Sequence, residues 1–180
     1  MWGFDPKDLG GWRVLYSADD RSSFIEHPAP AELAAEYVYK PKPVLPHRIE
    51  LLPDSQSLPR TSFDWNRDGD AYIELRSAAF EGSHHHQMLG YPSPVQNADM
   101  ELECQLASNG IYVGNPEGYQ DPRVPELKLG ADEWKLLLQL DSDDDTGWMW
   151  GDVGTLYFWV RESDARRCDF TKVWMIFQCC

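Results

Sequence analysis

The chain has 180 residues and a formal net charge of −14, and its length and 42% hydrophobic content predict one globular domain with a hydrophobic core. Because Lys and Arg bind phosphate groups, the balance of 30 acidic against 16 basic residues argues against binding to nucleic acid or to anionic lipid. The apolar runs are far shorter than the ~20 residues of a bilayer span and no basic-then-apolar leader opens the chain, so we expect a cytoplasmic protein without a membrane segment.

The first half of the chain carries weak and short signals. Short β-prone pieces occur at residues 12–16, 36–39 and 47–52. Seven prolines between residues 28 and 59 prevent long helices in that region. We therefore expect strands and irregular loops in this half.

Two helices are predicted in the middle of the chain. The first is expected to begin with Asp70 as its cap, to run to about Phe80 and to end at Gly82. Residues 99–109 are compatible with a strand or a helix. We favour a helix there, because Asp99 offers an N-cap and Asn109 with Gly110 offers a C-cap.

The C-terminal third carries the strongest signals, because five of the eight tryptophans lie between residues 134 and 174. Residues 135–140 and 155–161 predict two strands joined by an acidic loop, and residues 173–178 predict a third strand. We expect one helical turn capped by Ser163 between the second and third strands.

These elements predict an α+β fold, mostly an antiparallel sheet with a C-terminal meander and a few short helices. The apolar runs of the strands are continuous rather than alternating. We therefore expect both faces of the sheet to be buried.

Several separated strings, in this order, resemble one protein family. They are residues 87–92, 94–96, 100–105, 136–143, 150–158 and 169–179. With them the chain resembles the YwqG-like family of bacterial proteins of unknown function. The resemblance implies a single domain over residues 1–180 that lacks the N-terminal portion of the family's domain, and it brings no catalytic residues.

Acidic residues gather in the loop between the first two predicted strands. Asp141, Asp143 and Asp145 alternate as carboxylates do in calcium-binding loops, and Asp152 follows. The flanking strands and the position of Gly147 exclude an EF-hand. Two interpretations stay open, a solvated hairpin loop whose Asp side chains cap backbone amides or a divalent-cation site formed by these four aspartates. No other cofactor is predicted.

Two tryptophans follow the acidic loop. Alternation places Trp148 and Trp150 on one side of the chain and Met149 on the other, so at least one large apolar side chain is expected to stay partly exposed beside negative charge. Tryptophan is enriched at interaction hot spots, and acidic neighbours favour a basic partner. We therefore interpret Trp148 and Trp150 as a partner-binding surface for a basic protein; the alternative is that both indoles belong to the core.

The histidines and cysteines form no recognised site. Three consecutive residues do not all face one metal ion in regular structure, so we expect His84, His85 and His86 to form a surface loop. The four cysteines lack a CxxC motif and are expected to be free thiols. A soft-metal or redox site at Cys179 and Cys180 is the alternative.

Three functions are compatible with these patterns. We place first a non-enzymatic protein-binding module that uses the acidic, Trp-rich surface. A divalent-cation-binding protein acting through residues 141–152 is second, and an enzyme with an unrecognised site, acting on a polar small molecule or sugar between aromatic walls, is third. The sequence contains no nucleophile elbow, phosphate-cradling glycine loop or HExxH motif. The oligomeric state is not predicted.

Overall fold

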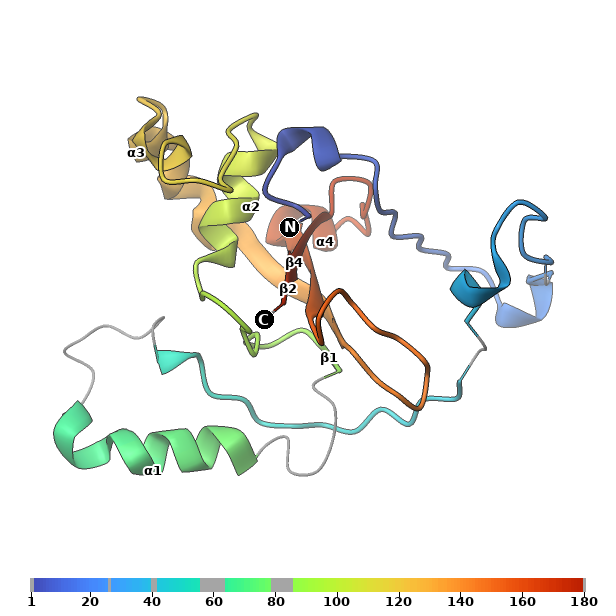
Figure 1. Ribbon diagram of the computed structural model, residues 1–180, viewed down its shortest axis with the longest axis horizontal. Coiled ribbons are helices and arrows are strands. Elements are labelled where there is room, and N and C mark those ends of the chain that lie inside the picture. Colours follow the sequence, from blue (N-terminus) through green and yellow to red (C-terminus); the bar gives the residue numbers. More distant parts are fainter. Residues whose placement is uncertain (1, 26, 40–41, 56–63, 79–85, 180) are drawn as a thin grey trace.

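An antiparallel sheet of four strands forms the centre of the structure, a computed structural model that describes residues 2–25, 27–39, 42–55, 64–78 and 86–179 (Figure 1). The strands are β1 (Gln87–Met88), β2 (Trp134–Asp141), β3 (Thr155–Arg161) and β4 (Trp174–Gln178), and they lie in the order β1-β2-β3-β4. Each strand is antiparallel to its neighbours. The predicted α+β fold and its C-terminal meander are confirmed; the two-residue strand β1 was not predicted.

One face of the sheet carries the hydrophobic core. Tyr157, Trp159 and Ile176 alternate along β3 and β4 and are fully buried. They pack in one cluster with Met100 and Cys104 from helix α2 (Met100–Ser108). The helix predicted for residues 99–109 is confirmed, with Asp99 as the N-cap residue and Asn109 as the C-cap.

The second face of the sheet is only partly covered. Its register sets Leu138 beside Phe158 and Leu140 beside Leu156, and all four side chains are half-buried. The expectation that both faces are buried is therefore wrong for the middle of this face. Helix α2 covers the first face, whereas the N-terminal segment lies along the β4 edge, where the Phe177 N–H donates to the Trp2 carbonyl oxygen at 3.0 Å.

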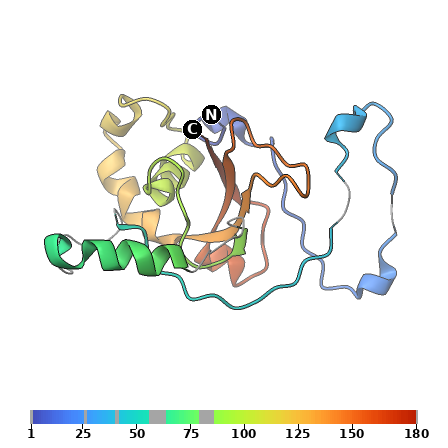
Figure 2. The same cartoon turned by 60° about the horizontal axis from the view of Figure 1, so that its bottom comes forward.

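Helix α1 (Trp65–Ala78) lies apart from the sheet (Figures 1 and 2). It begins earlier than predicted, because Asp64 rather than Asp70 caps it. The Asp64 carbonyl oxygen accepts the N–H groups of Arg67 and Asp68, and its side chain accepts the N–H of Asn66 at 3.1 Å. The expected helix end near Phe80 and Gly82 lies outside the described residues.

Short helices complete the fold. They are the 3-10 helices η1 (Pro6–Asp8), η2 (Arg21–Ser23), η3 (Ala35–Tyr37), η5 (Gly118–Gln120) and η6 (Lys128–Glu133) and the α-helices α3 (Val124–Leu127) and α4 (Glu162–Ala165). The helical turn after β3 is confirmed as α4, but Arg161 is its N-cap residue and Ser163 lies inside it. No helix in the described part of the chain is long and apolar enough to cross a membrane.

The strand-like pieces expected in the first half are wrong. Residues 12–16 and 47–52 are irregular, and residues 36–39 overlap η3 and continue without regular structure. A strand is stabilised by pairing with a neighbour, and the prolines around residues 36–39 and 47–52 remove backbone donors that such pairing requires.

Candidate functional site

The acidic loop between β2 and β3 is a hydrogen-bonded hairpin. Asp143 and Trp148 exchange both backbone hydrogen bonds, at 2.9 and 3.0 Å, and so form an isolated antiparallel bridge. Gly147 closes the turn with φ +77°, a conformation that favours glycine. The hairpin therefore holds its side chains in defined positions rather than as a loose loop.

Two of the four predicted ligand aspartates stabilise this hairpin. Asp141 Oδ1 accepts the N–H of Ser142 at 3.0 Å and the hydroxyl of Thr155 at 2.8 Å. Asp143 Oδ1 accepts the N–H of Asp145 at 2.8 Å, and only 8% of Asp143 is exposed. These contacts are what a loop with capped backbone amides requires.

The other acidic side chains of the hairpin point to solvent. Asp144, Asp145 and Asp152 are all exposed. Among the residues that the structure describes, no group of three or more His, Cys, Asp or Glu side chains is arranged to hold a metal ion. The cation site at Asp141, Asp143, Asp145 and Asp152 stays a prediction of the sequence.

The two tryptophans of the hairpin lie against each other at its surface. The rings of Trp148 and Trp150 are 5.8 Å apart and inclined by 34°, and both side chains are half-buried. Tyr39 meets both indoles edge-on, at 6.5 Å from Trp148 and 6.3 Å from Trp150. Met149, between them in the sequence, is 51% exposed. The hairpin thus presents a pair of indoles next to Asp144 and Asp145.

His86 ties this hairpin to the start of β1. Its Nδ1 accepts the N–H of Asp141 at 3.1 Å, and its Nε2 lies 3.2 Å from Asp143 Oδ2. Because Nδ1 is an acceptor, the ring proton resides on Nε2 and is donated to the Asp143 carboxylate. The ring also meets Trp148 edge-on at 5.7 Å.

Sequence reasoning missed the role of His86. It grouped this residue with His84 and His85, which lie outside the described residues. The available signal was its position directly before Gln87, which pairs with Gln139 of β2 and so brings His86 beside the end of that strand.

One polar side chain from each strand holds the segment 89–97, which follows β1. These side chains are Gln87, Gln139, Tyr157 and Gln178. On the β1 and β2 side, Gln87 Nε2 donates to the carbonyl oxygens of Leu89 at 3.0 Å and Tyr91 at 2.7 Å. Gln139 Oε1 accepts the N–H of Ser93 at 3.0 Å. Buried polar groups need such partners, which makes this segment a fixed part of the domain.

The β3 and β4 side chains hold the same segment further along. The Tyr157 hydroxyl donates to the Ser93 carbonyl oxygen at 2.7 Å, and burial raises the pKa of Tyr157, which keeps this donor protonated. Gln178 Oε1 accepts the N–H groups of Val95 and Gln96, both at 3.0 Å. We interpret this network as structural, because its polar groups are directed at the backbone of the segment.

Glu103 is a buried carboxyl with a strongly raised pKa. Its side chain is buried on α2, and burial raises its pKa from 4.5 to about 7. Oε1 accepts hydrogen bonds from Asn97 Nδ2 at 3.1 Å and from the Tyr119 hydroxyl at 3.5 Å. Oε2 has no partner among the described residues. A carboxyl in this state gains and loses its proton near neutral pH.

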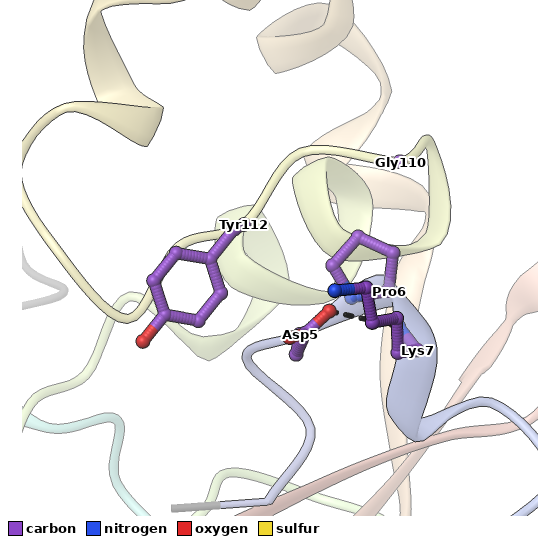
Figure 3. A pocket seen from close by; sticks show the side chains of 5 residues that line it. All are labelled: Asp5, Pro6, Lys7, Gly110 and Tyr112. Atoms are coloured by element: carbon purple, nitrogen blue, oxygen red, sulfur yellow. Dashed lines mark hydrogen bonds between the residues drawn. The ribbon is translucent and has the colours of Figure 1, made fainter.

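A shallow cavity of 470 Å³ lies where η1 meets the end of α2, and Figure 3 shows its lining. Asp5 accepts the N–H of Lys7 at 2.9 Å and so caps η1. Pro6, Gly110 and Tyr112 form the remaining lining. The carboxylate of this cavity thus has a structural role at the helix end.

Comparison with known families places the chain. A model of the family described as a domain of unknown function (DUF1963) matches residues 1–179. The chain belongs to this family. The DUF1963 match includes the whole sheet, the hairpin and the segment 89–97, and it confirms the resemblance to a domain family of unknown function. No curated protein matches the chain.

Proposed function

We propose that this chain is a non-enzymatic binding module of the cytoplasm that captures a basic protein through its acidic, Trp-rich hairpin. The observation that carries the proposal is the half-buried indole pair of Trp148 and Trp150 beside the exposed carboxylates of Asp144 and Asp145. The finer assignment to bacterial YwqG-like proteins rests on the sequence strings given above and is part of the same proposal.

The chemistry of this surface favours Lys and Arg side chains. A cation over the face of an indole is attracted by its ring electrons, and a neighbouring carboxylate strengthens that attraction. The chain's net charge of −14 further steers a basic protein toward it. Tyr39 and His86 fix the two indoles in place, which reduces the entropy lost on binding.

The test compares two hairpin variants with two matched controls in affinity capture from a lysate, followed by mass spectrometry. Trp148→Ala removes an indole, and its control is Tyr112→Ala, an exposed aromatic outside the hairpin. Asp144→Asn with Asp145→Asn removes two charges. Its control, Asp132→Asn with Glu133→Gln, removes two charges from exposed side chains at the opposite end of β2.

We expect that the wild type and both controls capture basic proteins. The two hairpin variants should not capture them. For a purified partner, Trp148→Ala is expected to weaken binding by about thirtyfold or more, the effect of an interface hot spot. Raising the salt concentration should weaken binding further through screening. Equal capture by wild type and hairpin variants of unchanged melting temperature would contradict the proposal.

A further inference from the structure

The partly covered face of the sheet contains a groove of 540 Å³ that shares only Trp150 with the partner-binding surface of the proposed function. Its floor includes the half-buried side chains of Leu156, Phe158 and Phe177 from β3 and β4. The indoles of Trp12 and Trp150 also line it. Sites for small molecules have volumes of roughly 300–1,000 Å³ and predominantly apolar linings, and this groove has both properties.

Both of these indoles are held by hydrogen bonds. Trp12 Nε1 donates to the Val173 carbonyl oxygen at 2.8 Å, and its ring meets Trp174 edge-on at 5.2 Å. Trp150 Nε1 donates to the Asp141 carbonyl oxygen at 3.1 Å. The groove is therefore formed before a ligand arrives, which reduces the ordering cost of binding.

The charge of the lining is opposite to that of the chain. The chain has 30 acidic residues, yet none of those within the described ranges lines the groove, and Arg13 is the one ionisable residue among its described lining. Arg13 is exposed and forms no hydrogen bond or ion pair with any residue in the described part of the chain. A guanidinium at the edge of an apolar groove favours a carboxylate, which it binds with two parallel hydrogen bonds.

We propose that this groove binds a small apolar anion, an aliphatic or aromatic carboxylate. The apolar part of the ligand lies on Leu156 and Phe158 in contact with the indoles that line the groove, and its carboxylate is bound by the Arg13 guanidinium. This proposal shares the Trp150 indole with the proposed function, but its test changes Arg13 and Leu156, neither of which belongs to the partner-binding surface, so the two proposals can fail separately.

The test uses two fluorescent probes of similar shape with the full chain. 1-Anilinonaphthalene-8-sulfonate is an anion, and N-phenyl-1-naphthylamine is uncharged. Arg13→Gln removes the cation and keeps the apolar floor, whereas Leu156→Trp fills the groove. Arg48→Gln is the matched control, because Arg48 is an exposed arginine outside the groove and its loss changes the net charge equally.

We expect one anionic probe to bind per chain and Arg13→Gln to weaken that binding about tenfold, the effect of one lost charge-assisted contact. The affinity for the uncharged probe should change less than twofold. Leu156→Trp should weaken both probes and Arg48→Gln neither. Dodecanoate should displace the anionic probe from the wild type and, at about tenfold higher concentration, from the Arg13→Gln variant.

Three results would overturn the proposal. They are equal affinity of wild type and Arg13→Gln for the anionic probe, an equal loss of affinity in Arg13→Gln and Arg48→Gln, and failure of dodecanoate to displace the probe. The first and second would show an apolar patch without an anion site. Arg13 is exposed and forms no hydrogen bond or ion pair with the residues that the structure describes, so this comparison holds even where Leu156→Trp fails to fold.

Discussion

Replacing Glu103 by Gln is expected to remove a large part of the pH dependence of the chain's stability. Only 1% of Glu103 is exposed, and burial raises its pKa from 4.5 to about 7. Between these two values the folded chain binds more protons at this site than the unfolded chain does. The free energy of unfolding therefore falls as the pH rises from 4.5 to about 7. Gln carries no charge, so the Glu103→Gln variant does not lose stability in this way.

The size of the effect follows from the pKa difference. Each pKa unit corresponds to about 1.4 kcal/mol, so ionised Glu103 lowers the stability by about 3 kcal/mol well above neutral pH. About 2 kcal/mol of this change falls between pH 5.5 and pH 8.5. In Glu103→Gln, the Nε2 donor would take the place of Oε2, which has no hydrogen-bond partner among the described residues. The resulting loss of stability does not vary with pH, because Gln does not ionise. The slope against pH is therefore the informative quantity.

Urea unfolding followed by tryptophan fluorescence measures this slope for the wild type, Glu103→Gln and the control Glu126→Gln. Glu126 is an exposed carboxyl on α3, so its replacement makes the same change in charge without burial. Other perturbed acids, such as Glu101, act in all three proteins and cancel in the differences. We expect Glu103→Gln to gain about 2 kcal/mol relative to the wild type across this pH range. Parallel stability curves for the three proteins would refute the reasoning.

Three further predictions concern the sheet and the hairpin. Leu136→Ala should cost about 2 to 5 kcal/mol of stability because Leu136 is buried, whereas half-buried Leu138→Ala should cost clearly less; equal melting temperatures for the two variants would contradict the burial pattern. Gln178→Ala should cost about 1 to 3 kcal/mol, because it leaves the N–H groups of the segment 89–97 without their acceptor, and faster hydrogen exchange in that segment should accompany the loss. Millimolar calcium should change the melting temperature only slightly, since Asp141 and Asp143 already accept hydrogen bonds within the hairpin. A calcium-dependent gain near 2.7 kcal/mol at about a hundredfold excess over Kd, abolished by Asp143→Asn with Asp145→Asn, would instead make the hairpin a metal site.

The strands that the sequence predicted share one property. The runs that became β2, β3 and β4 combine apolar and β-branched or aromatic residues over five to eight positions, and their local signal agrees with their tertiary role. Helix α2 was ambiguous by periodicity, and its capping residues decided it correctly. Helix α1 was misplaced at its start because Asp64 and Asp70 both suit an N-cap, and only the hydrogen bonds of Asp64 distinguish them.

Burial on the second face was mispredicted for a different reason. A continuous apolar strand is compatible with cover on both faces or with an open groove, because the sequence of a strand does not specify what packs against it. The half-buried Leu156 and Phe158 show the second case. Arg13 lies more than 140 residues before Leu156 and Phe158 in the chain. It becomes part of the same groove because the N-terminal segment runs along β4.

Polar residues of the sheet show the same limit of local sequence reasoning. Gln139 and Gln178 stand inside or at the end of apolar runs, where a polar residue usually indicates exposure, yet neither has any accessible surface. Their partners lie 46 and 83 residues away along the chain, in the segment 89–97. His86 likewise reaches Asp143 over 57 residues. A buried polar side chain is stabilised only by a partner that folding brings to it, so these contacts follow from the topology of the sheet and not from any local pattern.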